Sequence, residues 1–95
     1  MSAPAPELPV TAPRRVVTLY TRAGCHLCEA TLAILRRLQR KLDFHVREVD
    51  VDSDPGLAAR YGDRVPVVTY GYREVGAAPV SERRLRDALL RAMGR

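Results

Sequence analysis

The sequence predicts one α/β domain whose elements follow the order β-α-β-α-β-β-α and build a four-stranded mixed sheet flanked by helices. Two observations support this prediction. Short runs rich in β-branched residues alternate with segments whose apolar residues recur every three or four positions. The β-α-β start implies a parallel pair of strands with a right-handed crossover, and a hairpin near the C-terminus adds antiparallel strands. A chain of 95 residues can bury a single core, which leaves no room for a second domain.

The first strand and the first helix have the clearest patterns. Residues 15–21, RVVTLYT, form a β-branched and aromatic run that suits a strand buried on both faces. After Cys28, apolar residues fall on one stripe while most charged residues lie off it. The stripe consists of Thr31, Ile34, Leu35, Leu38 and Leu42. This spacing predicts an amphipathic helix of about four turns.

The middle of the chain predicts a second strand and a short second helix. Residues 43–51, DFHVREVDV, have the composition of a strand, although their alternation is irregular. Asp54 followed by Pro55 indicates a helix N-cap with proline at the first helical position. Gly62 provides a stop signal, so we expect a short helix through LAARY.

The C-terminal third predicts a hairpin and a last helix. VPVVTY gives the third strand and YREV the fourth, joined at Gly71 in a tight turn. Ser81 is a suitable N-cap for the last helix. Its apolar face consists of Leu85, Ala88, Leu89 and Ala92.

Composition excludes two classes of partner. The net charge is +5 and Lys41 is the only lysine, but the five aromatic residues are not interleaved with the arginines as nucleic-acid binding would require. No apolar run approaches the roughly 18 residues of a membrane helix. We therefore expect no nucleic acid and no membrane among the partners.

The N-terminus and the cysteine content indicate the compartment. Residues 1–14 are rich in alanine and proline and lack the apolar core of roughly 7–15 residues that a signal peptide needs. We expect these residues to be a disordered tail ahead of a domain at 15–95. We also expect a cytoplasmic location, where thiols are kept reduced. A cysteine pair there is more often catalytic or metal-binding than structural.

Cys25 and Cys28, the only cysteines, form a C-H-L-C motif where the first strand meets the first helix. Residues three apart on a helix have Cβ atoms about 5–6 Å apart, and a disulfide needs about 3.5–4.5 Å. The adjustable helix end allows this gap to close. The helix N-terminus favours a thiolate at Cys25, and Arg22, or His26 when protonated, adds to the effect. This predicts Cys25 as the nucleophile and Cys28 as the residue that resolves a mixed disulfide.

Two other interpretations of the pair stay open. Buried structural cysteines would also fit an apolar helix face and would make the domain a redox-inactive adaptor. One CxxC pair with His26 and His45 does not complete a four-ligand zinc site, so we predict no metal site in a single chain. An iron–sulfur cluster or metal shared between two chains, in a non-enzymatic dimer, is the second alternative.

Two motifs resemble those of a known family. YTRAGCHLC resembles the active-site corner of glutaredoxins, where an aromatic strand end leads through a basic residue to C-P-Y-C. Val65-Pro66 in RVPVV resembles the family's T-V-P segment, whose proline is cis and faces the cysteines. DVDSDPGLAARYGDRVPVV is similar to small bacterial glutaredoxin-like proteins, and the element order is that of the thioredoxin fold. The resemblance spans about residues 15–93 and implies a thiol–disulfide oxidoreductase that reduces protein or glutathione mixed disulfides.

The resemblance also implies a substrate-binding or glutathione-binding set of residues. Arg22 would meet a carboxylate of glutathione, and the backbone of Val65, fixed by Pro66, would pair with a substrate chain. Pro66 would also keep metals away from the thiolate. Gly76 and Ser81 would preserve a backbone turn and a helix N-terminus. The full set is Arg22, His26, Leu27, Val65, Pro66, Gly76 and Ser81.

Departures from the family pattern concern the reductant. His26 and Leu27 replace the proline and tyrosine of C-P-Y-C, and VGAAPVSERR lacks the acidic pair that holds glutathione in the family. Glutathione is therefore one candidate co-substrate, and a thioredoxin-reductase-type enzyme is the other candidate reductant. We expect a monomer with no tightly bound cofactor.

Overall fold

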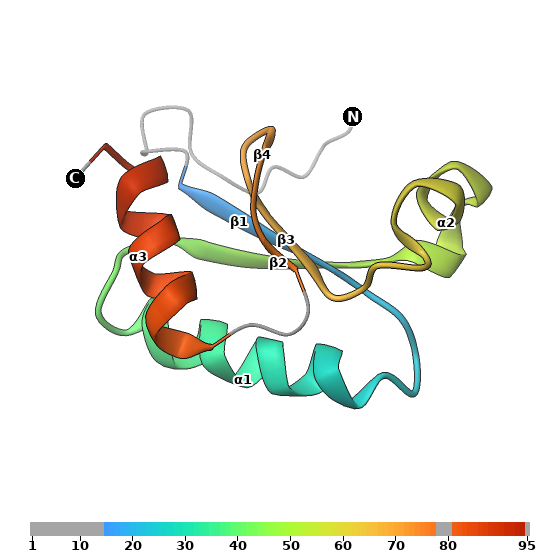
Figure 1. Cartoon of the computed structure of the whole chain (residues 1–95), viewed down its shortest axis with the longest axis horizontal. Helices are drawn as coiled ribbons and strands as arrows, with labels where there is room; N and C mark the ends of the chain where they lie inside the picture. The colour runs from blue at the N-terminus through green and yellow to red at the C-terminus, as the bar shows by residue number, and fades with distance from the viewer. Residues whose placement is uncertain (1–14, 78–80, 95) are drawn as a thin grey trace, which may run out of the picture.

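The computed structural model of the chain describes residues 15–77 and 81–94 (Figure 1). The predicted tail at 1–14 lies outside the described residues. In chain order the elements are β1 (Val16–Thr21), α1 (His26–Gln39), β2 (His45–Asp50), the 3-10 helix η1 (Val51–Ser53), α2 (Pro55–Tyr61), β3 (Val67–Tyr70), β4 (Arg73–Ala77) and α3 (Glu82–Ala92). The predicted order is confirmed, and among the described residues η1 is the one element that the sequence patterns did not predict.

The four strands form one mixed sheet in the order β2-β1-β3-β4. β1 runs parallel to β2 and antiparallel to β3, and β4 is antiparallel to β3. Tyr20 near the end of β1 pairs with Val49 of β2 and with Val67 at the start of β3. The loops after β1 and β2 and the loop before β3 therefore meet at a single edge of the sheet.

α1 and α3 cover one face of this sheet (Figure 1). Their apolar stripes, the inward residues of β1 and β3, and Phe44 just before β2 form the larger core. Its buried members are Val17, Leu19, Leu35, Leu38, Phe44, Val68, Leu85 and Leu89. Full burial of one such side chain contributes about 1.5–3 kcal/mol relative to exposure, so this face supplies most of the apolar stabilisation.

The opposite face has a smaller core beside α2 and η1. Successive strand residues point to opposite faces, so Tyr20 lies on this side while its neighbour Leu19 lies under the helices. The Tyr20 and Tyr61 rings stack with centroids 4.1 Å apart. The guanidinium groups of Arg60 and Arg64 lie 5.4 and 5.6 Å from the centre of the Tyr61 ring. Burial, followed by the neighbouring Tyr61, raises the pKa of Tyr20.

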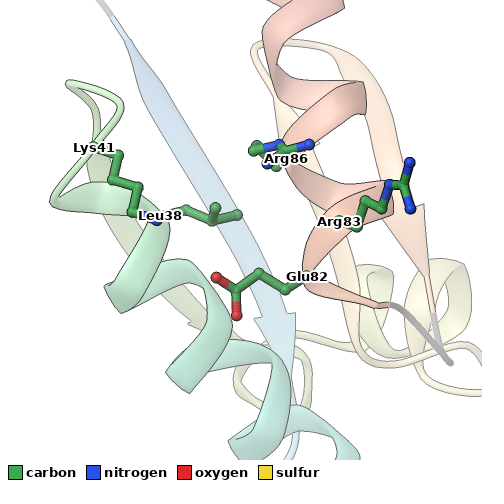
Figure 2. Close-up of a pocket in the computed structure, with 5 residues that line it drawn as sticks. All are labelled: Leu38, Lys41, Glu82, Arg83 and Arg86. Carbon is green, nitrogen blue, oxygen red and sulfur yellow. The ribbon is translucent and has the colours of Figure 1, made fainter.

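A groove of about 490 Å³ lies between α1 and α3 (Figure 2). It is lined by Leu38, Lys41, Glu82, Arg83 and Arg86. Leu38 is thirteen residues after Cys25, which at about 1.5 Å per helical residue places the groove roughly 20 Å along α1 from the cysteines. The groove is therefore separate from the cysteine corner. None of the helices in the described part of the chain is long and apolar enough to cross a membrane.

Candidate active site

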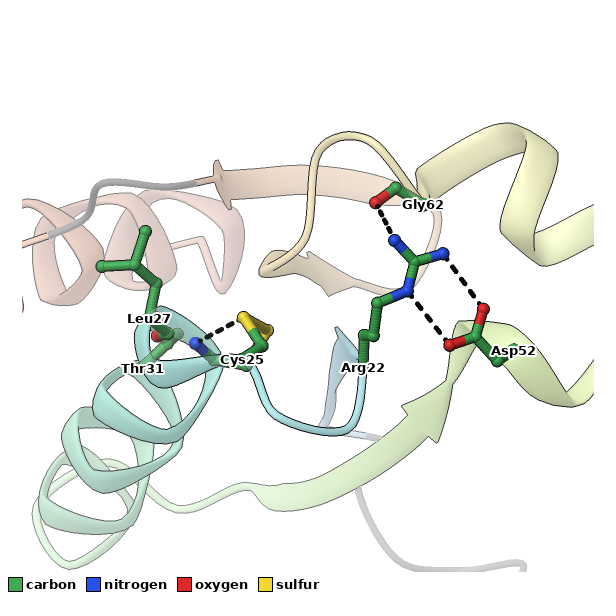
Figure 3. Close-up of a disulfide and its surroundings, with 7 residues drawn as sticks. Arg22, Cys25, Leu27, Thr31, Asp52 and Gly62 are labelled. Carbon is green, nitrogen blue, oxygen red and sulfur yellow. Dashed lines mark hydrogen bonds and ion pairs between the residues drawn. A yellow bond between two sulfur atoms is a disulfide. The ribbon is translucent and has the colours of Figure 1, made fainter.

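Cys25 and Cys28 are joined by a disulfide at the N-terminus of α1, with their Cα atoms 5.2 Å apart (Figure 3). Cys25 is the N-cap residue, and its Sγ accepts a hydrogen bond of 3.1 Å from the backbone N–H of Cys28. A sulfur thus occupies the position where a serine or aspartate oxygen usually caps a helix. An N-cap sulfur that accepts such a bond is in a position where negative charge is stabilised.

The two cysteines differ in their access to solvent. Cys28 is 2% exposed and belongs to the buried face of α1, whereas Cys25 is half-buried. A bulky partner can therefore approach the sulfur of Cys25 and not that of Cys28. This is the asymmetry that a nucleophile and a resolving cysteine require.

The local sequence explains why the corner takes this shape. Gly24 has φ +75°, a left-handed conformation that glycine adopts without steric cost, and it reverses the chain between β1 and α1. One turn into the helix, the buried Thr31 donates its hydroxyl to the carbonyl of Leu27 at 2.8 Å, so its polar atom is satisfied. The corner is thus fixed from both sides of Cys25.

The Val65-Pro66 peptide bond is cis, as the resemblance implied. Pro66 is fully buried and Val65 is half-buried. Because Val67 pairs with Tyr20 at the end of β1, the Val65-Pro66 segment lies at the same sheet edge as the cysteine corner. The structure therefore brings these two predicted site segments to one edge.

Arg22 makes a different set of contacts from the one we expected. Its Nε and Nη2 donate to the two carboxylate oxygens of Asp52, each at 3.0 Å, and its Nη1 donates to the carbonyl of Gly62 at 3.0 Å (Figure 3). The hydrogen bond from Arg22 lowers the pKa of Asp52, and the same bond raises the pKa of Arg22. Arg22 thus ties the loop before Cys25 to η1 and to the end of α2.

Gly62 is required by this arrangement because of space. A Cβ at this position would clash with the carbonyl oxygen of Ala58 and would lie 3.0 Å from Nη2 of Arg22. The sequence patterns identified Gly62 only as a helix stop. Its second role depends on a side chain forty residues away.

The remaining predicted residues lie in three places. His26 and Leu27 are exposed in the first turn of α1, with Leu27 54% exposed. Ser81 is the N-cap of α3, and its hydroxyl accepts from the N–H of Arg84 at 3.1 Å. Gly76 lies inside β4 opposite Val68, so the backbone turn that we expected there is wrong. A strand partner on β3 holds this segment extended, and a role for Gly76 or Ser81 in substrate binding stays a prediction.

Asp52 is the residue of this region that the sequence patterns missed. The run from Asp50 to Asp54 indicated only a strand end and a helix cap, and both functions are present. Asp50 accepts from the N–H of Asp52 at 2.9 Å, and Asp54 accepts from the N–H of Leu57 at 3.2 Å. Across residues 15–77 and 81–94, no group of three or more His, Cys, Asp or Glu side chains is placed to hold a metal ion.

Comparison with known proteins assigns the architecture. The Glutaredoxin-like domain (DUF836) family matches residues 16–91. An uncharacterized protein of Mycobacterium tuberculosis is 40% identical over 84 residues, which cover 83% of this chain and 87% of the relative. These matches cover nearly the whole described region, and they confirm the predicted resemblance to glutaredoxin-like proteins.

Two solved structures support the same assignment of the fold. A structural genomics target protein from X. campestris shares 35% identity and a TM-score of 0.67, covering 77% of this chain and 93% of its own. A mutant thioredoxin from Halobacterium salinarum shares 26% identity and a TM-score of 0.61, covering 80% of this chain and 72% of its own. The predicted thioredoxin fold is confirmed.

Proposed function

This chain belongs to the Glutaredoxin-like domain (DUF836) family, and from that premise we propose that it is a thiol–disulfide oxidoreductase whose Cys25 and Cys28 cycle between dithiol and disulfide. The observation that carries the proposal is the position of Cys25. Its sulfur caps α1, accepts the N–H of Cys28 and is half-buried, while Cys28 is buried behind it.

The proposed reaction begins with the dithiol form. The thiolate of Cys25 attacks one sulfur of a substrate disulfide, the substrate S–S bond breaks, and the leaving thiolate takes up a proton. Cys28 then loses its proton, and its thiolate attacks Sγ of Cys25 in the mixed disulfide. The second substrate thiol leaves, and the Cys25–Cys28 disulfide forms. Two electrons have passed from the cysteine pair to the substrate.

Two features of the corner support Cys25 as the attacking residue. Free N–H groups at a helix N-terminus and the helix dipole stabilise a thiolate more than a thiol. The exposed His26 follows Cys25 directly, and a protonated imidazole there would add to the same effect. Cys28 needs no such activation, because it attacks a sulfur already held next to it.

We propose that the substrate chain lies over Leu27 and the backbone of Val65 at the edge formed by the cysteine corner and Pro66. Protein disulfides and glutathione mixed disulfides are the candidate substrates. Either glutathione or a thioredoxin-reductase-type enzyme would regenerate the dithiol, so we propose no tightly bound cofactor. We place this reaction in the cytoplasm, where such reductants act, and propose a monomer as the active form.

The test is reduction of a glutathione mixed disulfide, coupled to glutathione reductase and NADPH. We expect turnover with the wild type and its loss in Cys25→Ser, because the nucleophile is gone. Cys28→Ser is the matched control, since it keeps Cys25 and, when treated with the glutathione mixed disulfide without free glutathione, should accumulate a mixed disulfide at Cys25 visible by mass spectrometry. Equal activity in wild type and Cys25→Ser would contradict the proposal.

A second measurement separates the enzyme from the adaptor and the cluster-binding dimer. We expect iodoacetamide to alkylate Cys25 of the reduced protein faster than a free thiol at neutral pH. Alkylation at the rate of an ordinary thiol would favour a redox-inactive adaptor. Visible absorbance with a shift to dimer after anaerobic reconstitution with iron and sulfide would favour the metal-binding alternative.

A further inference from the structure

The cation nearest to Cys25 in the chain is already bound to a carboxylate of the protein. Arg22 precedes Cys25 by three residues, and its guanidinium is turned away from the disulfide toward Asp52 and Gly62 (Figure 3). Both bonds to Asp52 have N–O distances of 3.0 Å, the bidentate geometry that arginine also uses to recognise a ligand carboxylate. Asp52 thus occupies the position that a ligand carboxylate would take.

The guanidinium is held in place on its third side as well. Nη1 donates to the carbonyl of Gly62, and the absence of a Cβ at Gly62 leaves just enough space for Nη2. A ligand carboxylate that pairs with Arg22 in the same bidentate way would have to displace Asp52 and would leave that negative charge next to its own. Asp50 and Asp63 lie close enough to Arg22 to raise its pKa further. Asp52 therefore binds the guanidinium directly, and two further carboxylates add to the negative charge that acts on it.

We propose that Asp52 is a specificity-determining residue, which removes Arg22 from reach of substrate carboxylates and so disfavours glutathione relative to thiols and disulfides without a carboxylate near the reacting sulfur. This inference rests on the proposed function. It favours neutral or cationic segments of protein substrates over glutathione at this site. Glutathione, which carries two carboxylates, is a poor partner for this edge as long as Asp52 is ionised.

The test follows reduction of the Cys25–Cys28 disulfide by two thiols that differ in charge. Glutathione is compared with its diethyl ester, in which both carboxylates are esterified. The attacking thiolate bonds to Sγ of Cys25, the Cys25–Cys28 bond breaks, and the Cys28 thiolate takes up a proton. A second thiol then attacks the mixed disulfide and releases the oxidised thiol with reduced Cys25. Acid quenching and mass spectrometry give the rate constant for each thiol.

The informative quantity is the ratio of the rate constant for glutathione to that for its ester. In the wild type, we expect glutathione to reduce the Cys25–Cys28 disulfide no faster than the ester does. Asp52→Asn should raise the ratio about two- to fivefold, the effect of freeing one exposed charge for pairing. General damage to the fold changes the rate constants for both thiols together and leaves their ratio unchanged. A change in the ratio therefore reports a change in specificity. Asp52→Ser is the second variant, should the first fold poorly, and should raise the ratio similarly.

A neighbouring carboxylate provides the matched control. Asp63→Asn removes one negative charge from the same region but leaves the Arg22–Asp52 pair intact. We expect it to change the ratio less than Asp52→Asn does. In the double variant Arg22→Gln with Asp52→Asn, the ratio should return to the wild-type value, because the Arg22 guanidinium is no longer present. Equal effects of the two single variants would replace the inference with a general effect of local charge.

Failure of this inference and failure of the proposed function give different results. If neither thiol nor dithiothreitol reduces the Cys25–Cys28 disulfide, the proposed function fails. If all three reduce it and Asp52→Asn leaves the ratio unchanged, Asp52 does not determine specificity while the redox function stands.

Discussion

Among the described residues, the face of the sheet under α1 and α3 buries eight apolar side chains in one cluster, whereas the face toward α2 buries three. The smaller cluster is supplemented by contacts of another kind. Tyr61 stacks on Tyr20, and its ring centre lies 5.4 and 5.6 Å from the guanidinium groups of Arg60 and Arg64. Arg22 links the loop before Cys25 to η1 and to the end of α2 through hydrogen bonds. The loop before Cys25 and the segment before Pro66 both adjoin this second face. The comparison indicates that one face supplies stability and the other positions the site.

The largest expected effect is a cavity on the α1/α3 face. Leu89 is fully buried on α3, and Leu89→Ala should lower the free energy of unfolding by about 2–5 kcal/mol. Chemical denaturation measures this loss. The rate at which iodoacetamide alkylates Cys25 in the folded variant should stay at the wild-type value, because Leu89 belongs to the cluster under α1 and α3, whereas Arg22 in the loop before Cys25 is held by η1 and the end of α2.

The matched control on the same helix is Arg91→Ala, at an exposed position, which should change the free energy of unfolding by no more than about 0.5 kcal/mol. A large change in Cys25 reactivity in folded Leu89→Ala would contradict the division between the two faces.

The next effect in size concerns the aromatic stack on the other face. Tyr61→Leu removes the ring that packs on Tyr20 and faces Arg60 and Arg64, and should lower the free energy of unfolding by about 1–2 kcal/mol. We expect faster amide hydrogen exchange in residues 62–65 while α3 keeps its protection. Tyr72→Leu is the control, since Tyr72 is fully exposed at the β3–β4 turn. Uniformly faster exchange in all elements would argue against a local role of the stack.

The same division determines how far sequence patterns could predict the fold. On the α1/α3 face the order and type of the elements followed from periodicity, because apolar stripes such as Leu35 with Leu38 and Leu85 with Leu89 have a single way to be buried. The bounds were less accurate. The predicted strand at 43–51 is shorter, since the side chain of Asp50 accepts from the N–H of Asp52 and opens η1. No spacing rule signals that capping bond in advance.

The candidate site also contains a part that could be predicted from the sequence and a part that could not. Cys25 and Cys28 could be found from the sequence because a helix N-terminus and a three-residue spacing are local properties. The partner of Arg22 could not, because Asp52 is thirty residues away and only the meeting of the loops after β1 and β2 brings the two together. The contact of Gly62 with Arg22 was missed for the same reason.

A smaller effect is the pH dependence that Asp52 introduces. The hydrogen bond from Arg22 lowers the pKa of Asp52 in the folded chain, so folding favours the ionised form. Its contribution is fully present above the unfolded pKa of about 3.9 and is lost as the pH falls through the lower folded value. We expect the unfolding temperatures of wild type and Asp52→Asn to differ at neutral pH and to converge in acid.

Thermal unfolding from about pH 7 to about pH 2 measures this convergence. Arg22→Gln removes the other half of the pair, and its unfolding temperature should converge with that of the wild type over the same pH range. A difference between wild type and Asp52→Asn that persists unchanged at the acid limit would mean that the charge of Asp52 does not stabilise the fold.

The smallest expected effect comes from breaking the Arg37–Glu82 ion pair on the α1/α3 face, which can be compared with the Arg22–Asp52 pair. Nε of Arg37 donates to Glu82 at 2.9 Å across the groove between the helices (Figure 2 shows Glu82), and both side chains are partly exposed. Glu82→Gln should lower the free energy of unfolding by about 0.2–1 kcal/mol, and high salt should reduce the loss. A double-mutant cycle with Arg37→Gln isolates the pair.

The decisive comparison is between Glu82→Gln and Asp52→Asn in the two-thiol assay. Both variants remove one carboxylate that is paired with an arginine, and both therefore raise the net charge by the same amount. Glu82 pairs with Arg37, which lies roughly 18 Å along α1 from Cys25, so the loss of Glu82 should leave the ratio of glutathione to ester rates unchanged. An equal rise of the ratio in both variants would show that the net charge of the protein determines the preference between glutathione and its ester. A rise in Asp52→Asn alone would show that the preference depends on which carboxylate holds Arg22.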